Sequence, residues 1–389
     1  MSVQLPFEQG HPLDVPAVVG ALRSRGPVHK VRTAVGDEAW WVADHARVRR
    51  LLVDDRLGRA HRTPETAART GESALFGGPL GDFDSERTDH ARMRSLLQPH
   101  FTPGRMRALR PRVEALTGRL LDDLAAGPRP VDLHAALALP LPVLVICELL
   151  GVPYEDRDEF RSWTQAASDI HDRDRSLGGL GALFEYGKRL VARKRREPDD
   201  DVISRLCAVD DVGDDEAAML SMALLFAGHE TTVVQIGMGV LHLLAYPDQW
   251  RALRQDPSLV ASAVEEIMRA PVQGGGGIPR YARTDLEVDG VVIRAGDLVL
   301  LDIGAANHDP AVFTDPDRFD IARPAQPHLA FGHGARYCIG APLARIELQA
   351  VLTHLVPRFP TMTLAVPVEE LAVRRDTLTG GLVELPVTW

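Results

Sequence analysis

The chain has 389 residues and a net charge of −10, so it is long enough to bury a large core and too acidic to favour nucleic acid as a partner. Its first ten residues have neither the basic start nor the apolar core of a signal peptide. The most apolar run, residues 137–152, contains two prolines and a glutamate and is too short to span a bilayer. We therefore expect a cytoplasmic protein without a membrane partner.

The first predicted elements are a β-hairpin and a short helix. Residues 28–35 and 38–42 are β-rich runs separated by Gly36-Asp37, which is a hairpin signal. A helix is predicted at about residues 44–53. The stretch from there to about Arg87 is rich in Gly, Pro, Thr and Ser and has no sustained period. A loop of that length in a compact protein is usually functional or mobile.

The next predicted helix begins at Asp89 and ends near Phe101, and it carries two cationic side chains on one face. His90 and Arg94 are four residues apart, so they lie one helical turn apart and could together hold a pair of carboxylates. Taken alone, such a pair is more often part of a solvated helix face.

The segment that follows is strongly basic. From residue 92 to residue 112 there is no Asp or Glu, and on an acidic protein such a block marks a place where an acidic protein partner is steered in. A helix surface that merely favours arginine is an equally good explanation. The arginine block consists of Arg92, Arg94, Arg105, Arg107, Arg110 and Arg112.

Helical patterns fill the middle of the chain. Between the helices predicted at residues 156–170 and about 181–196 lie residues 172–181, where three glycines predict a flexible connector. Such a pair of helices could act as a lid over the substrate entrance. Cys147 lies in an apolar run and is assigned to the core. The predicted helices are residues 111–126, 142–150, 156–170 and about 181–196.

The longest helical pattern runs from Asp214 to Tyr246, and Pro247 ends it. Its middle, residues 227–232, reads Ala-Gly-His-Glu-Thr-Thr, a poor helix centre because it combines glycine with two β-branched residues. A threonine there can bond to the carbonyl four residues back and bend the helix, and an acid beside an alcohol in such a bend could relay protons. The simpler explanation is a helix whose polar residues face solvent.

A further helix is predicted over residues 260–269. Glu266 and Arg269 are three residues apart on one face of it and can pair, although such pairs are common on surfaces. Beyond it the sequence predicts a glycine-rich segment at 270–277, a β-hairpin at 288–296 and short strands at 361–389.

The third cysteine lies near the end of a glycine-rich loop, residues 331–340, which reads Phe-Gly-His-Gly-Ala-Arg-Tyr-Cys-Ile-Gly. Apolar residues recur at helical spacing after Cys338, so we expect a largely buried helix that begins at the cysteine. A sulfur at a helix N-terminus favours its thiolate form, which suits a metal ligand or a nucleophile. Gly340 and the aromatic Phe331 favour a large flat ligand. For the cysteine alone, burial as a small core residue is an equally good explanation.

This loop resembles the haem-binding loop of the cytochrome P-450 family, Phe-x-x-Gly-x-Arg-x-Cys-x-Gly, at every signature position. The motifs noted above occur in family order, so the resemblance extends over nearly the whole chain and predicts one domain over residues 1–389. The implied fold is mainly α with small β-sheets, a large helical domain with a β-rich lobe. One departure is His308, where the family has arginine. The signature residues are Phe331, Gly334, Arg336, Cys338 and Gly340.

The resemblance also implies a haem b cofactor and a role for each motif. Cys338 would be the axial thiolate of the iron, and Glu230 and Thr231 would deliver protons to dioxygen. The pair Glu266–Arg269 would support the cysteine loop. The haem propionates would be held by His90, Arg94, Arg280 and Arg336. The expected substrate-pocket residues are Phe226, Ala227, Gly277 and Ile278.

The activity that the resemblance implies is that of a haem-thiolate monooxygenase, which hydroxylates or epoxidises a small organic substrate in secondary metabolism. Electrons would come from NAD(P)H through a reductase and a ferredoxin or flavodoxin-like protein, which would dock at the arginine block. Three alternatives remain. The same scaffold could couple two carbons or rings, or the protein could be a haem sensor or carrier, which would not need the Glu-Thr pair. A cysteine hydrolase would need a positioned histidine base.

Overall fold

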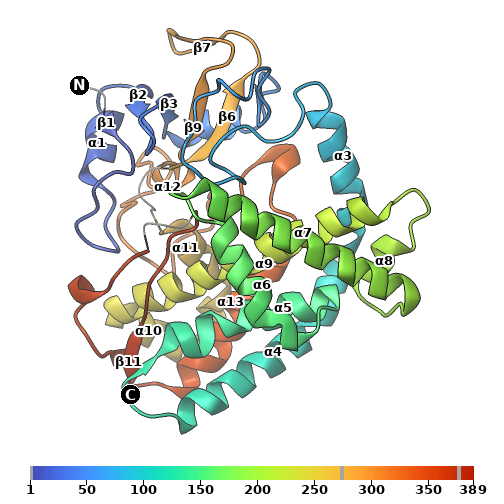
Figure 1. Cartoon of the computed structure of the whole chain (residues 1–389). Helices are drawn as coiled ribbons and strands as arrows, with labels where there is room; N and C mark the ends of the chain where they lie inside the picture. Colours follow the sequence, from blue (N-terminus) through green and yellow to red (C-terminus); the bar gives the residue numbers. More distant parts are fainter. Residues whose placement is uncertain (1–2, 272–275, 375–377) are drawn as a thin grey trace. The chain divides into compact units, whose positions relative to one another are not determined.

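The structure is a computed structural model that describes residues 3–271, 276–374 and 378–389 (Figure 1). The chain divides into two compact units. The β-rich unit contains residues 1–91 and 261–338, and the helical unit contains residues 92–260 and 339–389. The predicted fold class, mainly α with small β-sheets, is confirmed. A single domain over the whole chain stays a prediction.

A six-stranded sheet organises the β-rich unit, with strand order β1-β2-β3-β9-β6-β4. β2 and β3 form the predicted antiparallel hairpin, with Val28 opposite Val42. Alternate residues of β9 face two separate apolar clusters, Val299 one and Leu298 the other, as the two-residue repeat of a strand requires. The strands are β1 Val3–Gln4, β2 Val28–Arg32, β3 Glu38–Val42, β4 Leu57–Gly58, β6 Ile278–Ala282 and β9 Leu298–Leu301.

Short helices and a second hairpin complete this unit. The predicted hairpin is confirmed as β7 and β8, and its turn has Asp289 and Gly290 at φ of 50° and 82°, the positive values that a two-residue hairpin turn needs. Asp44 caps α2 by accepting a hydrogen bond from the Arg47 backbone N–H. The remaining elements are α1 Ala17–Arg23, α2 His45–Leu51, α3 Glu86–Leu97, α11 Val260–Arg269, β7 Leu286–Val288, β8 Val291–Ile293 and α12 Ile303–Ala306; α3 continues into the helical unit.

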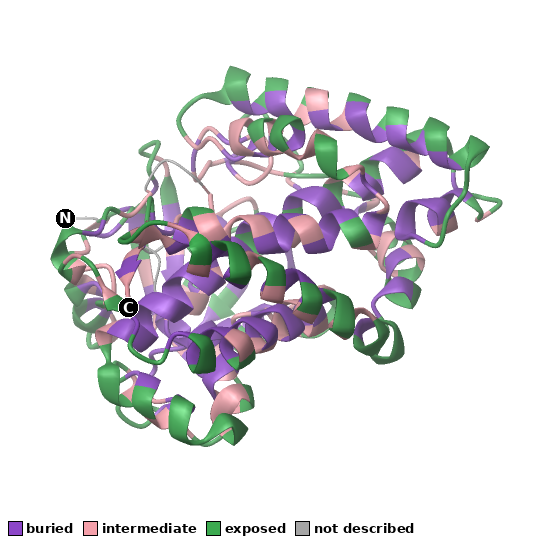
Figure 2. Ribbon diagram, turned by 90° about the horizontal axis from the view of Figure 1, so that it is seen from below, coloured by how far each residue is buried: buried purple, intermediate pink, exposed green. Residues whose placement is uncertain are grey.

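The helical unit is built around α9, which packs against α5, α7 and α8. Most of its helices carry exposed residues along one side and buried residues along the other (Figure 2). Its longer helices are α4 Pro103–Ala126, α5 Pro140–Leu150, α6 Arg157–Ala167, α7 Arg173–Arg196, α8 Val202–Cys207, α9 Asp214–Ala245, α10 Pro247–Gln255 and α13 Ala341–Arg358. Its sheet contains β5 Val131–Asp132, β10 Thr363–Leu364 and β11 Pro386–Thr388.

Single turns link the longer elements. A π-helix spans His134–Ala138. The 3-10 turns are Gln98–His100, Tyr154–Asp156, Pro257–Leu259, Gly334–Arg336 and Val368–Glu370. Within the described residues, α9 is the one helix long and apolar enough to cross a membrane, and 56% of its most apolar window is buried inside the protein. A core helix passes the same test.

Several predicted helix boundaries are wrong; the helix predicted from Asp89, for example, begins at Glu86. Residues 172–181 are no connector, because α7 begins at Arg173. A side chain at Gly179 would come within 2.5 Å of the Ala167 backbone nitrogen, so this glycine allows α6 and α7 to pack closely. The helix predicted from Pro111 begins at Pro103 and continues through Pro111. The helix predicted from Cys338 begins three residues later, as α13.

Glu347 on α13 offers a test of this packing. Its side chain is 1% exposed and its Oε2 atom has no hydrogen-bond partner within the described residues, and burial raises the pKa of the carboxyl well above its usual value. The folded state therefore binds a proton that the unfolded state releases, and stability falls as the pH rises above the carboxyl's usual pKa.

We therefore expect Glu347→Gln to raise the free energy of unfolding relative to the parent, and to raise it more at pH 8 than at pH 5. The slope is up to about 1.4 kcal/mol per pH unit. Urea unfolding at both pH values measures it, with Glu370→Gln at an exposed position as the control. An equal effect of Glu347→Gln at both pH values would contradict this account of α13.

Candidate functional site

Cys338 is the exposed cysteine of the chain. Its backbone N–H donates to the Phe331 carbonyl at 2.9 Å, which closes the loop 331–340. Cys147 and Cys207 are buried, as was expected for Cys147, and burial raises the pKa of Cys147 to about 12. Those two thiols therefore stay protonated at neutral pH, whereas Cys338 is exposed.

The bend of this loop depends on glycine at two positions. Gly332 and Gly334 have φ values of 72° and 73°, in the left-handed region that other residues rarely adopt. A side chain at Gly334 would also come within 2.3 Å of Val53. Gly340 precedes α13 with φ of −81°, which any residue can adopt. The Phe331 ring is buried and packs against Tyr337.

A buried carboxylate, Glu86, organises the arginines of the β-rich unit. It is 7% exposed and accepts hydrogen bonds from Arg336 and from the backbone N–H groups of Arg59 and Ala60, the latter two at 2.8 and 3.1 Å. Arg283 lies 3.4 Å from its second oxygen. These bonds fix the guanidinium of Arg336 in place beside the start of α3.

The same cluster holds more positive than negative charge. Arg280 is 6% exposed and donates to the carbonyl of its neighbour Pro279. Burial and the nearby Arg59 and Arg336 lower the pKa of Arg280 to about 9, and burial with Arg336 lowers that of Arg59 to about 10. Guanidinium groups that disfavour their own charge in this way form a site for an anion. Arg59 and Glu86 were not predicted from the sequence.

His90 and Arg94 lie one turn apart on α3, and both are partly buried. They therefore lie on one helical face, as their four-residue spacing predicted. Glu86 begins the same helix four residues before His90, which is the one sequence signal that would have pointed to Glu86 as part of this face.

The centre of α9 stays helical through residues 227–232. Thr231 is exposed and its hydroxyl donates to the Ala227 carbonyl at 3.1 Å, as predicted. Glu230 and its neighbour His229 are buried, so the explanation in which these polar residues face solvent is wrong. A side chain at Gly228 would meet Ile146 at 2.5 Å, which shows that this glycine makes room for α5.

The expected pocket residues come from both units. In the helical unit, Phe226 is buried and Ala227 is exposed on α9. In the β-rich unit, Ile278 begins β6 and Gly277 precedes it with φ of 63°. A side chain at Gly277 would come within 3.0–3.1 Å of the Leu301 and Asp302 backbone. Residues 272–275 of the predicted glycine-rich segment lie outside the described residues.

Glu266 and Arg269 form a buried two-bond ion pair, with N–O distances of 2.7 and 2.8 Å. Arg323 also donates to Glu266, at 3.1 Å. Arg269 donates to the backbone carbonyls of Asn307 and Pro316, so the pair fixes the irregular chain that leads to the cysteine loop. Such two-bond pairs give geometric specificity as well as energy.

His308, at the position where an arginine was expected, keeps a charged partner. Its Nδ1 lies 3.0 Å from Asp317 Oδ1, and its Nε2 lies 2.9 Å from the Ala270 carbonyl. The hydrogen bond to His308 lowers the pKa of Asp317. Both ring nitrogens of His308 therefore have partners, and one of these partners is a carboxylate.

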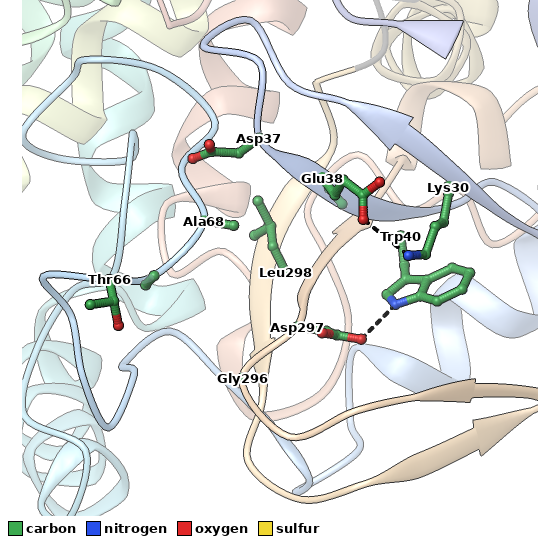
Figure 3. A pocket seen from close by; sticks show the side chains of 11 residues that line it. Lys30, Asp37, Glu38, Trp40, Thr66, Ala68, Gly296, Asp297 and Leu298 are labelled. Atoms are coloured by element: carbon green, nitrogen blue, oxygen red, sulfur yellow. Dashed lines mark hydrogen bonds and ion pairs between the residues drawn. The ribbon is translucent and has the colours of Figure 1, made fainter. Parts of the chain in front are cut away.

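A cavity of about 310 Å³ in the β-rich unit is lined by none of the site residues described above (Figure 3). Lys30 pairs with Glu38 at 3.0 Å, and the Trp40 indole donates to Asp297 at 2.8 Å. None of its lining residues is a predicted site residue. Its charged side chains already have partners, since Asp37 accepts a hydrogen bond from the Arg69 backbone N–H. It therefore does not replace the cysteine loop as the candidate site.

Comparison with known proteins shows relatives along the whole chain. A family model described as cytochrome P450 matches residues 183–369. Pentalenolactone synthase of Streptomyces exfoliatus is 45% identical over 396 residues, which cover 99% of each chain. Nocardicin C N-oxygenase of Nocardia uniformis subsp. tsuyamanensis is 42% identical, and mycinamicin IV hydroxylase/epoxidase of Micromonospora griseorubida is 40% identical; each covers 99% of this chain and is covered to 98%.

Solved structures give the same result. The crystal structure of the putative thioether synthase SgvP, involved in the tailoring step of griseoviridin, superposes with a TM-score of 0.93 at 35% identity and full coverage of both chains. Substrate-free PimD, an epoxidase of the polyene macrolide pimaricin, has a TM-score of 0.89 at 41% identity, covering 100% of this chain and 99% of its own. The predicted fold is confirmed.

The buried pair Glu266–Arg269 can be tested by removing one charge. Glu266→Gln leaves Arg269 buried without its anion, so we expect it to lower the free energy of unfolding by about 3–5 kcal/mol. Glu265→Gln is the control. The neighbouring Glu265 side chain is 37% exposed and pairs with His328, and a partly exposed pair of this kind is worth about 1 kcal/mol or less. Urea unfolding measures both, and equal losses would contradict the assigned difference.

Proposed function

The chain belongs to the cytochrome P450 family and is a P450 monooxygenase; from this premise we propose that it hydroxylates or epoxidises a small organic substrate of secondary metabolism. The observation that carries the proposal is the exposed Cys338 at the end of a loop bent by left-handed glycines. The relatives named above, which include an N-oxygenase and a hydroxylase/epoxidase, support this class of reaction.

The residues of the β-rich unit fit a haem. Cys338 would hold its iron through the thiolate, and the arginine cluster with its excess positive charge would hold its two propionates. Arg280 and Arg336 were expected in this role, and Arg59 joins them. When bound, a thiolate-ligated haem supplies the electron density that favours cleavage of the dioxygen bond. His90 and Arg94 would supply further donors to the propionates from α3.

Glu230 and Thr231 would move protons at the centre of α9. The Thr231 hydroxyl is exposed and donates a hydrogen bond to the Ala227 carbonyl. Rotation of this side chain would let the hydroxyl donate to a bound molecule instead. Glu230 is buried beside it and has a lowered pKa: burial raises the pKa, but the His229 hydrogen bond and nearby positive charges outweigh burial. A carboxylate that exchanges protons with a neighbouring alcohol can deliver them to a reacting oxygen.

The substrate would lie against Phe226, Ala227, Gly277 and Ile278. Two of these, Ala227 and Gly277, are exposed and lack bulky side chains, which suits the close approach of a substrate to the backbone.

Turnover under ¹⁸O₂ tests the function. The haem-loaded protein, a surrogate ferredoxin with its reductase, and NAD(P)H would be supplied with substrates that shift the haem spin state. The proposal expects one ¹⁸O atom in the product. A coupled product without ¹⁸O would favour oxidative coupling instead, and no substrate-dependent NAD(P)H consumption would favour a sensor or carrier.

Cys338→Ser tests the ligand. We expect this variant to lose the strongly red-shifted Soret band of the reduced, carbon monoxide-bound protein, because serine cannot supply a thiolate. Cys207→Ser, at a buried cysteine outside the site, should keep the band. An unchanged spectrum in Cys338→Ser would remove Cys338 from the site.

For electron supply, we propose a ferredoxin or flavodoxin-like donor in the cytoplasm, reduced from NAD(P)H, that docks at the arginine block. Several members already have partners in the helical unit: Arg92 binds Asp211 and Glu216, and Arg112 binds Glu148. Arg105 and Arg107 are exposed on α4, so they are the members most open to an acidic partner.

The double variant Arg105→Glu/Arg107→Glu should slow reduction by a ferredoxin about tenfold or more at low salt, with a smaller effect at high salt. Stopped-flow reduction measures the rate, and dithionite reduction should be unchanged. Arg119→Glu, exposed on the same helix, is the matched control. Equal rates in the double variant and Arg119→Glu would contradict docking at this block.

A further inference from the structure

His229 is a completely buried histidine beside the proposed proton-delivering acid. Its side chain has no exposed surface, and its Nδ1 lies 2.7 Å from the Leu225 carbonyl. A carbonyl can only accept a hydrogen bond, so Nδ1 carries a proton. The protonation of His229 is therefore decided at the other nitrogen, Nε2.

Nε2 faces two oxygens. It lies 3.3 Å from the Thr164 hydroxyl and 3.4 Å from Glu230 Oε1. The Thr164 hydroxyl donates its hydrogen to the Arg161 carbonyl at 2.9 Å, so its lone pairs face the ring. Without a proton between Nε2 and Glu230, lone pairs would oppose one another at a buried position, which is costly.

The surroundings of the pair favour a charged Glu230. Phe160 of α6 packs edge-on against the His229 ring. The second oxygen of Glu230 lies 3.5 Å from the Thr379 hydroxyl. The charged groups near it from other elements are Arg161 of α6 and Arg374 of the C-terminal segment, and Arg374 lies 3.4 Å from His134 Nε2.

We propose that His229 stores the proton that Glu230 delivers. The Nε2 proton passes to Glu230 Oε1, and Glu230 releases a proton from its other oxygen toward the Thr231 hydroxyl. His229 then becomes a neutral imidazole that keeps its Nδ1 proton. A proton that returns through Glu230 recharges the ring. His229 acts through Glu230 and is a positioning residue; the inference rests on the role proposed for Glu230.

Nitrogen-15 NMR of histidine-labelled, haem-loaded protein in the reduced, carbon monoxide-bound state at pH 7 tests the shared proton without turnover. The ring signal lost in His229→Phe identifies His229, and His229→Gln serves if the phenylalanine variant does not bind haem. The proposal expects protons on both ring nitrogens in the parent. In Glu230→Gln it expects a proton on Nδ1 only, because the glutamine amide can donate to Nε2.

Thr164→Val is the matched control, because it removes the other oxygen that faces Nε2 and leaves Glu230 in place. It should keep both ring protons. A ring that carries a single proton in the parent, or that is unchanged in Glu230→Gln, would overturn the proposal.

The functional consequence is measured as product formed per NAD(P)H consumed. We expect His229→Phe to lower this ratio about fivefold or more while haem content and the melting temperature stay close to those of the parent. An unchanged ratio would overturn the role of His229 as a proton store. If no substrate is oxidised by the parent, the proposed function fails, whereas the NMR result still decides whether the proton is shared.

Discussion

The proposed haem site of this protein depends on one constraint: an exposed cysteine must be held on a backbone that is neither a long helix nor a strand. Gly332 and Gly334 take up left-handed conformations, and the Cys338 N–H closes the loop on the Phe331 carbonyl. The chain before the loop is irregular as well, so it needs its own anchor. That anchor is the buried Glu266–Arg269 pair, which binds carbonyls along residues 307–318.

Buried charge is managed differently in the two units. In the β-rich unit, Glu86 neutralises only part of the positive charge of its arginines, and this imbalance suits an anionic ligand. In the helical unit, His229 Nε2 lies 3.4 Å from Glu230 Oε1, and the proton that we propose between them would balance the buried carboxylate. Paired charges are the ones that a protein interior tolerates, so each arrangement points to the chemistry at its site.

The sequence predicted the elements whose signals are local. The Gly36-Asp37 hairpin, the long helix ended by Pro247 and the back-bonding threonine at 231 are set by neighbouring residues, and they are present. It failed where packing decides. The glycines near 179 suggested a flexible connector, but Gly179 is there because α6 leaves no room for a side chain.

For the candidate site, too, local patterns pointed to some residues and missed others. Motif spacing pointed to Cys338, Glu230 and Arg336, because these residues belong to short patterns. Arg59, Glu86 and Thr164 belong to no such pattern. They meet their partners from positions 27 to 250 residues away, so only the folded chain brings them together.

The measurement that tests the central claim most directly is the visible absorption spectrum of the purified parent protein, reduced and then exposed to carbon monoxide. The account predicts a strongly red-shifted Soret band, because it assigns Cys338 as the thiolate ligand of the haem iron. A band typical of histidine ligation, or a protein that takes up no haem, would contradict it.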